Sequence, residues 1–308
     1  MGLFDVILPY ILSGISVGGQ YALIAIGYSM VYGILRLINF AHGDVFMVAG
    51  LMMVYLAASL PIYLAAPLVV VLTVALGFLI ERAAYKPLRS APRMSVMISA
   101  IGVSYLLQNM ALYITGGLNK NYPVIPWISD SITVLGATTK RVTVITPVLM
   151  ILLVIALMLL INKTKMGMAM RAASRDFETS QLMGVKLNSV ISVTFVIGSF
   201  LAAIASMLFF SNYPGVIPAA GAMPGLKAFV AAVFGGIGSV AGAVLGGLLI
   251  GVCESIIKGM DTILVHSGAL QSPLELATFS DAFTFILLIV ILVFKPTGLF
   301  GEKATEKV

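Results

Sequence analysis

Eight long apolar runs dominate this sequence and constrain its fold more than any other feature. They cover residues 7–34, 40–59, 62–80, 96–115, 144–161, 190–210, 229–257 and 282–293. A helix needs roughly 20 apolar residues to cross the hydrocarbon core of a bilayer. Charged residues make up only 10% of the chain, which is too few to coat the surface of a soluble domain. The sequence predicts an all-α integral membrane protein with about eight transmembrane helices in a single domain, residues 1–308.

Two of these runs are longer than a straight span requires. The first and the seventh each contain about 28 residues, which predicts a helix plus a broken or re-entrant piece in each. The last run is short unless its helix begins nearer Leu276.

The placement of basic residues predicts the orientation of the chain. Lys and Arg gather in the connections 81–94 and 162–189, so both are expected in the cytoplasm, and 116–141 is expected on the outside. The tail is ambiguous. Its lysines, Lys295, Lys303 and Lys307, favour the inside, whereas eight simple spans would put it outside. A re-entrant element near Gly235 would reconcile the two. The net charge of +6 lies in such short connections, which favours a lipid surface and argues against nucleic acid as a partner.

Several catalytic classes lack their motifs. No G-x-x-x-x-G-K-[ST] phosphate loop and no G-x-S-x-G nucleophile elbow occurs. The two histidines, His42 and His266, are far apart and have no cysteine or carboxylate cluster beside them. The sequence therefore predicts a non-catalytic chain, with no cofactor and no metal site, that cannot hydrolyse ATP unaided.

The stretch 39–44 places polar and ionisable residues between the first two apolar runs. Gly43 is expected to break the helix there, and Asp44 could cap the helix over 45–59 or pair with Arg36. Such groups at membrane depth are costly and usually face a bundle interior or a water-filled cavity. An ordinary capped helix at the bilayer surface is the alternative.

A similar pattern occurs near the other end of the chain. A short apolar piece at 227–234 is followed by a glycine-rich break at 235–239 and a long helix over 240–257. Discontinuous helices in both halves are typical of internal repeats whose broken helices meet near the bilayer midplane. The freed backbone groups must then line a cavity or lie within protein, which predicts a solute pathway. The glycines of the following helix, Gly242, Gly246, Gly247 and Gly251, are interpreted as a packing face.

Other polar residues within apolar runs have simpler interpretations. Glu254 could face a pathway, but an interfacial position near a helix end is preferred. Gln108 and Asn109 are interpreted as hydrogen-bonding partners between helices. In the connection 162–189, helical spacing predicts one short amphipathic helix over 168–183 that ends at Gly184. That helix could lie on the membrane or dock into another protein.

Several distinct short motifs follow one another in a characteristic order along the whole chain. They are Tyr21-Ala22-Leu23, Val31-Tyr32-Gly33, Asn39-Phe40-Ala41-His42-Gly43-Asp44, Glu81-Arg82, Tyr85-Lys86-Pro87, Ile98-Ser99-Ala100-Ile101-Gly102, Gln108-Asn109, Met166-Gly167, Arg171-Ala172, Leu182-Met183-Gly184-Val185, Lys227-Ala228-Phe229, Gly235-Gly236-Ile237-Gly238-Ser239 and Pro296-Thr297-Gly298. In this order they resemble the inner-membrane permeases of branched-chain amino acid ABC importers, and among the two permease types the LivH-like one.

This resemblance implies a pseudo-repeat ABC importer permease fold and a multi-pass protein of the bacterial inner membrane. It implies a heterodimer with a second permease subunit, two cytoplasmic ATPase subunits and an extracytoplasmic substrate-binding protein that delivers leucine, isoleucine or valine. The expected substrate pathway comprises Tyr21, Asn39, His42, Gly43, Asp44, Gly235, Gly236, Gly238 and Ser239. The segment 168–184 is expected to be the coupling helix, with Arg171, Ala172, Arg175, Asp176, Leu182 and Gly184 in contact with an ATPase.

Alternatives to this function follow from the same residues. The compact E-A-A-x-x-x-G loop of other ABC importers is missing, because Ala172 and Ala173 are too far from Gly184. Urea and short-chain amide permeases share the N-F-A-H-G region, so the solute is left open. A proton-coupled secondary transporter using His42, Asp44 or Glu254, and a membrane scaffold without a pathway, are further alternatives.

Overall fold

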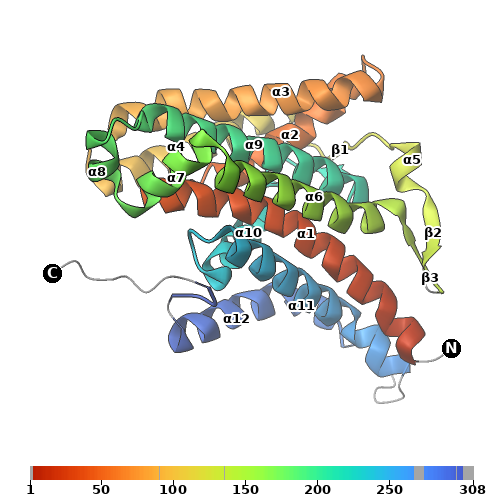
Figure 1. Ribbon diagram of the computed structural model, residues 1–308. Helices are drawn as coiled ribbons and strands as arrows, with labels where there is room; N and C mark the ends of the chain where they lie inside the picture. Colours follow the sequence, from red (N-terminus) through yellow and green to blue (C-terminus); the bar gives the residue numbers. More distant parts are fainter. Residues whose placement is uncertain (1–2, 90, 135, 267–273, 296, 301–308) are drawn as a thin grey trace.

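The computed structural model describes residues 3–89, 91–134, 136–266, 274–295 and 297–300, and most of them are helical (Figure 1). Pro296, Lys303 and Lys307 lie outside this described part. The helices are α1 (Leu3–Leu35), α2 (His42–Ala57), α3 (Ile62–Ile80), α4 (Arg93–Thr115), α5 (Pro126–Ser129), α6 (Arg141–Lys163), α7 (Lys165–Arg175), α8 (Phe177–Leu182), α9 (Leu187–Asn212), α10 (Ala222–Gly235), α11 (Val240–His266) and α12 (Ser280–Phe294). A π-helical turn (Glu81–Tyr85) and a 3₁₀ turn (Lys86–Leu88) extend α3, and a second 3₁₀ turn (Leu276–Phe279) precedes α12. The strands are β1 (Lys120–Asn121), β2 (Ser131–Val134), β3 (Ala137–Lys140) and β4 (Gly215–Val216).

Within the described residues, seven helices are long and apolar enough to cross a membrane, and α2 and α10 are shorter apolar helices. This confirms a helical membrane fold with interrupted elements. The turn from Leu276 lengthens the last span to Leu276–Phe294, as the short final run required.

The two halves of the chain repeat one arrangement. In Figure 1, α1 runs diagonally between a group containing α3, α4, α6 and α9 and a group formed by α10, α11 and α12. A long helix, a short helix and another long helix follow one another in α1–α2–α3 and again in α9–α10–α11. Helix α1 packs against α10 and α11, as α9 packs against α2 and α3. Helix α9 begins at the end of the bundle where α1 ends, so the two repeats are inverted.

The first apolar run is not broken, which corrects the expectation of an interruption within it. Helix α1 is continuous over 33 residues, and the chain breaks after it, at 36–41, where Arg36 adopts a positive φ of 55°. Helix α2 has only 16 residues, about 24 Å of helix, which is less than the roughly 30 Å hydrocarbon core. The first residue of α2, His42, lies beside Gly27, two turns before the end of α1. The contact is so close that a Cβ on this glycine would overlap the His42 ring. The run 40–59 is therefore a partial span.

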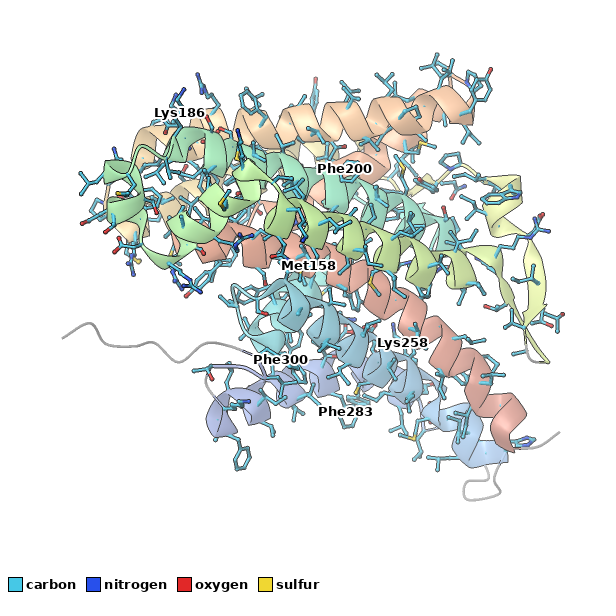
Figure 2. All side chains as sticks on the ribbon, viewed as in Figure 1. Met158, Lys186, Phe200, Lys258, Phe283 and Phe300 are labelled. Atoms are coloured by element: carbon cyan, nitrogen blue, oxygen red, sulfur yellow. The ribbon has the colours of Figure 1, made fainter. Side chains whose placement is uncertain are left out.

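The seventh run is split as predicted. Helix α10 ends at Gly235, and the break contains Gly236 and Gly238 at φ +105° and +95°, a region that glycine adopts without steric cost. The carbonyls of Phe234 and Gly235 accept hydrogen bonds of 2.9 Å from the backbone N–H groups of Leu299 and Phe300. The segment after α12 thus satisfies carbonyls that the end of α10 leaves open; Figure 2 labels Phe300 beside this end.

The small residues of α11 form a packing face, as the sequence predicted. A Cβ on Gly247 would lie 2.6 Å from the backbone nitrogen of Ala22, and one on Gly251 would overlap the backbone of Gly18. Toward α10, a Cβ on Gly246 would overlap the carbonyl of Ala231. Helix α11 therefore approaches both α1 and α10 at backbone distance.

The end of α1, the break after α10 and the tail lie together at one end of the bundle. Arg36, just after α1, donates a 3.1 Å hydrogen bond to the carbonyl of Ser174 in α7. A Cβ on Gly33, in the last turn of α1, would lie 3.6 Å from Gly238. The break after α10 and the tail bonded to it therefore lie at the end that holds the basic connections. Segment 213–235 runs back from the opposite end of the bundle to the basic end. The chain therefore passes between the two ends once more than the eight spans counted from the sequence, and the segment after α12 lies at the basic end.

The opposite end carries an ordered rim. Strands β2 and β3 form an antiparallel hairpin, and β1 pairs with β4 just before α10. Tyr122 is buried there on the ring of Phe210, with centroids 5.8 Å apart, and burial raises the pKa of its hydroxyl. Connection 116–141 is thus structured and fixes the start of the segment that leads to α10.

The connection 162–189 contains two helices instead of the single helix predicted over 168–183. Asp176 has an extended backbone and its side chain accepts a hydrogen bond of 3.1 Å from the N–H of Thr179, so it ends α7 and caps α8. Gly184 ends α8 at φ +86°, which confirms the predicted stop. An Asp at the centre of an amphipathic pattern favoured a cap over continuation of the helix.

Candidate functional site

The N-terminal ends of the two short helices, α2 and α10, meet backbone to backbone. A Cβ on Gly43 would lie 2.8 Å from the carbonyl oxygen of Gly221 and 3.1 Å from the Cα of Gly225. Each of these distances is too short for a side chain, so glycine is required on both sides of the contact. The predicted break at 39–44 therefore lies against the start of α10, beside Gly27 and Tyr28 of the neighbouring helix α1.

A cavity of about 290 Å³ lies beside this contact. Its lining residues come from α1, α2, α4, α10 and the break before α2. They are Tyr28, Ile38, Phe40, Gly43, Asp44, Ile101, Ser104, Tyr105, Gln108, Gly221, Ala222, Gly225, Leu226 and Phe229. Most of the wall consists of apolar side chains and glycine. Its polar side chains are those of Tyr28, Asp44, Ser104, Tyr105 and Gln108. A pocket of this character fits a small solute.

Asp44 provides the charge of this cavity. Its carboxylate accepts hydrogen bonds of 2.5 Å from the hydroxyl of Ser104 and 3.0 Å from the side-chain amide of Gln108, both on α4. The residue is only 2% exposed. Two neutral donors therefore hold a buried carboxylate at the cavity wall.

Two expectations for Asp44 are wrong. The helix begins at His42, Ala41 occupies the N-cap position without a side-chain cap, and Asp44 lies in the first turn with its carboxylate bonded to α4. Arg36 bonds to the carbonyl of Ser174 in α7 and does not pair with Asp44. The break turns the chain back into the bundle, which separates these two residues although they are close in sequence.

The amide residues of α4 behave differently from each other. Gln108 bonds Asp44 of α2, which confirms its predicted role between helices and adds it to the cavity wall. Asn109 bonds the carbonyl of Tyr105 in its own helix at 2.7 Å, so the interhelical interpretation is wrong for that residue.

Asn39 and His42 are buried around the break but do not line the cavity. The side-chain oxygen of Asn39 accepts a 2.7 Å hydrogen bond from the hydroxyl of Tyr85. The His42 ring packs edge-on against Tyr28 with centroids 5.0 Å apart. Its Nε2 atom has no hydrogen-bond partner among the described residues. Both side chains hold the re-entrant turn in place.

Tyr21 belongs to a separate buried cluster on the other side of α1. Its hydroxyl donates a 2.9 Å hydrogen bond to Glu254, whose carboxylate also accepts from Lys227 at 2.8 Å and Lys258 at 2.5 Å. Lys227 additionally pairs with Asp281 at 2.5 Å. Glu254 is 1% exposed, so the preferred interfacial position was wrong. The cluster joins α1, α10, α11 and α12, and Figure 2 shows Lys258 in the lower group of helices.

The second break lies at the other end of α10 from the contact of Gly43 with Gly221 and Gly225. Gly235 and Gly236 are buried, Gly238 is exposed and Ser239 is half-buried, where its hydroxyl accepts a 3.1 Å hydrogen bond from the N–H of Gly242. None of these residues lines the cavity beside Asp44. Helix α10 connects the two predicted parts of the pathway, with its start at the cavity and its end at the basic end of the bundle.

Sequence reasoning missed several residues of the cavity wall. Tyr28 and Ser104 lie in apolar runs without a distinguishing pattern, and their role depends on how α1 and α4 pack. Gly221 and Gly225 did have a signal. They are four residues apart at the start of the second short helix, as Gly43 lies at the start of the first.

The predicted coupling residues gather at the basic end of the bundle. Arg171, Ala172 and Arg175 are exposed on α7, Leu182 is 86% exposed at the end of α8, and Gly184 follows it. The guanidinium of Arg171 donates to the carbonyl of Ile161 at the end of α6. An apolar side chain exposed on a short helix beyond the spans is suited to contact another protein.

A second, larger cavity of about 830 Å³ opens beside α8. Four basic residues, Arg36, Arg89, Arg93 and Lys186, line it, and Figure 2 shows Lys186 at this end. Arg89 is fixed by the carboxylate of Glu81 and the side chain of Asn188. This end of the molecule therefore presents a positively charged hollow next to the predicted coupling segment.

The ionisable groups named for a proton relay are not connected. Asp44 bonds to α4, Glu254 bonds to its lysines and Tyr21, and His42 lies between α1 and α9. Within the described residues, no hydrogen bond joins any two of them. In the same part of the chain, no group of three or more His, Cys, Asp or Glu side chains could hold a metal ion.

Together, these features define a class: a polytopic membrane permease in which two short helices of inverted repeats meet beside a solute-sized cavity. Comparison with known proteins gives the family. The chain belongs to the family described as branched-chain amino acid transport system / permease component, which matches residues 10–292. It is a multi-pass protein of the inner membrane.

Two similar relatives match almost end to end. The chain is 38% identical to the high-affinity branched-chain amino acid transport system permease protein BraD of Pseudomonas aeruginosa over 98% of each chain. It is 37% identical to the corresponding LivH protein of Escherichia coli K12, over 98% of this chain and 97% of that one. Among solved structures, PsaBC from Streptococcus pneumoniae matches 96% of this chain and 92% of that chain, with 12% identity and a TM-score of 0.42.

Proposed function

We propose that this chain is the non-catalytic membrane subunit of an ABC importer that passes branched-chain amino acids inward by alternating access. The main support is the cavity where α2 and α10 begin, because it lies between two inverted repeats, beside Tyr28 of α1. Rocking of one repeat against the other around such a site would expose it to each side in turn.

The proposal includes partners that supply energy and solute. A second permease subunit would complete the translocation unit, two cytoplasmic ATPases would hydrolyse ATP, and an extracytoplasmic binding protein would deliver the amino acid. The names of the similar relatives support this assignment, since both are permease proteins of high-affinity branched-chain amino acid transport systems.

The pathway would run from the cavity along α10 to the second break. Gly43 and Asp44 would contact the solute directly. Asn39, His42 and Tyr21 would hold α1 and the re-entrant turn, and 235–239 would form the cytoplasmic end of the path. The exposed position of Gly238 beside the end of α1 supports the last assignment.

Reconstitution of the complete complex in proteoliposomes tests this function. We expect leucine uptake that requires the loaded binding protein outside and ATP inside. A complex whose ATPases carry inactivating substitutions is the matched control and should not accumulate leucine. Uptake at full rate by that control would overturn the proposal, and uptake abolished by an uncoupler but insensitive to ATP depletion would favour a proton-coupled transporter.

The coupling segment would comprise α7, α8 and Gly184. Leu182→Ser would remove an apolar contact with the ATPase without exposing any core, because this side chain is already 86% exposed. We expect fewer leucine molecules imported per ATP hydrolysed, in a complex that still assembles. Leu118→Ser, at a 65% exposed leucine on the opposite end, is the matched control. Equal coupling ratios for the two variants would contradict the assignment.

A further inference from the structure

The three buried carboxylates of the described residues are compensated in different ways. Glu81 is fully buried and pairs with Arg89, and Glu254 pairs with both Lys227 and Lys258. Asp44 is equally buried, yet its described partners are the neutral side chains of Ser104 and Gln108. Asp44 is also the one of the three that lines the cavity of about 290 Å³.

An unpaired carboxylate inside a membrane protein is unfavourable, because neutral hydrogen bonds replace only part of the lost hydration. Among the described lining residues of this cavity, none carries a positive charge. The N-terminal end of α2 contributes a partial positive charge, since Asp44 lies in its first turn. A cation from outside the chain would complete the compensation of an ionised Asp44.

We infer that Asp44 binds the ammonium group of the transported solute, and that the cavity therefore selects small apolar molecules bearing a primary ammonium. This inference rests on the proposed function and specifies the chemistry of its site. A contact of this kind would distinguish α-amino acids from neutral solutes such as urea and short-chain amides, because neutral solutes bring no positive charge to the carboxylate.

The geometry of the carboxylate suits this ligand. Each oxygen of Asp44 accepts one hydrogen bond, and a carboxylate oxygen has a second lone-pair position. Ser104 and Gln108 fix the orientation of the carboxylate, so little ordering remains to be done when an ammonium arrives. An ammonium bound there forms charge-assisted hydrogen bonds, which are stronger than those of a neutral amide.

The remaining wall suits the rest of an aliphatic amino acid. Phe40, Ile101, Leu226 and Phe229 provide apolar contacts for a branched side chain. Gly43, Gly221 and Gly225 also line the cavity and carry no side chain, so the solute can approach the start of α2 and α10 closely. The ammonium contact at Asp44 is the specific part of the inference, and these contacts are consistent with it.

Protection of an introduced thiol measures binding in the cavity independently of transport. The reporter is Ile101→Cys in a Cys253→Ala background, within the complete nucleotide-free complex, labelled with N-ethylmaleimide. Ile101 lines the cavity and makes no hydrogen bond to Asp44, and Cys253 is the single native cysteine. Labelling rates are compared with leucine, isopentylamine, 4-methylpentanoate, propionamide and sodium chloride as additions.

We expect leucine and isopentylamine to slow labelling and the other three additions to leave it unchanged. Asp44→Asn should weaken protection by leucine about tenfold or more, the effect of losing one charged hydrogen-bond pair. Asp130→Asn makes the same chemical change at an exposed carboxylate paired with Arg141 in the outer connection, and should leave protection unchanged.

The comparison of ligands keeps the test decisive even if Asp44→Asn does not assemble. Equal protection by isopentylamine and 4-methylpentanoate, protection by propionamide, or protection by sodium chloride alone would each overturn the inference. Failure of the proposed function would look different: the unsubstituted complex would not accumulate leucine with ATP, whatever the pattern of protection.

Discussion

Gly27 shows how strongly one residue can fix the re-entrant turn. The His42 ring occupies the space that a side chain at this position would need, and Gly198 of α9 lies against both this ring and Gly27. We expect Gly27→Ala to lower the free energy of unfolding by about 1–3 kcal/mol, the usual cost of overpacking a filled interior. Thermal denaturation of the purified complex measures this effect.

Gly102 provides a matched control for Gly27, because it is also helical but has no atom within 4 Å of a built Cβ. Gly102→Ala should leave the denaturation midpoint unchanged or raise it slightly, since alanine favours helix over glycine. Equal midpoints for the two variants would show that His42 is not fixed by this contact.

Glu254 pairs with two lysines, and its loss would leave Lys227 with Asp281 alone and Lys258 without its described carboxylate partner. Glu254→Gln is expected to destabilise the protein by about 3–5 kcal/mol, as for other buried pairs broken from one side. Asp130→Asn removes an exposed partner of Arg141 at 3.3 Å and should cost about 0–1 kcal/mol. Thermal denaturation of both variants in the same detergent provides the comparison, and a smaller effect for Glu254→Gln than for Asp130→Asn would refute the expectation.

At the residue scale, polarity could be predicted from sequence but partners could not. The sequence indicated Asp44 and Gln108 as unusual residues within apolar runs, and the structure joins them. The sequence also suggested that Asp44 pairs with the nearby Arg36 and that Glu254 lies at the membrane interface. Both of these predictions were wrong. Pairing in a helical bundle depends on which faces meet, and single-chain periodicity does not contain that information.

At the scale of elements, the connection between the tail and α10 is open to a direct test. Gly298 has φ +75°, and a Cβ there would lie 2.6 Å from the carbonyl of Val233 and the nitrogen of Gly236. We expect Gly298→Ala to push the tail off the end of α10 and speed amide exchange at Leu299 and Phe300. Hydrogen–deuterium exchange of the complex followed by mass spectrometry measures these amides.

Gly116 is a suitable control for Gly298, because its φ is +66° but nothing lies within 4 Å of a built Cβ. Gly116→Ala therefore introduces the same backbone strain without the contact. Faster exchange at the tail in this variant as well would mean that strain alone, and not the lost packing on α10, explains the effect.

The helices were predicted well where the length of an apolar run or a glycine-rich break sets their bounds. They were predicted poorly where a side-chain cap interrupts an amphipathic pattern. The runs that became α3, α4, α6 and α9 and the split between α10 and α11 were identified from sequence. The continuity of α1 was not, because a long apolar run does not show whether its extra length lies in one helix. The division of α7 from α8 depends on Asp176, whose capping bond outweighed the helical periodicity around it.

At the scale of the whole molecule, the inverted repeats explain why two short helices are tolerated. Each begins beside the other inside the bundle, at the contact of Gly43 with Gly221 and Gly225. The N–H groups of Asp44 and Ala222 bond to carbonyls of the turns just before them, so these helix ends are satisfied within protein instead of facing lipid. The buried carboxylates Glu254 and Glu81 join the two repeats to each other. Tyr21 of α1 donates to Glu254 of α11, and Ser192 of α9 donates to Glu81 after α3.

The same arrangement fixes the topology of the chain, which single-cysteine labelling can test in oriented vesicles. In a Cys253→Ala background, Glu178→Cys in α8 and Thr297→Cys in the tail segment are both exposed at the basic end. Leu118→Cys is exposed at the opposite end. Because α10 and its preceding segment add one crossing, we expect a membrane-impermeant maleimide applied outside to label only the Leu118→Cys variant. Labelling of Thr297→Cys together with Leu118→Cys would mean that segment 213–235 does not traverse the membrane, and the two repeats could not then be inverted around the cavity.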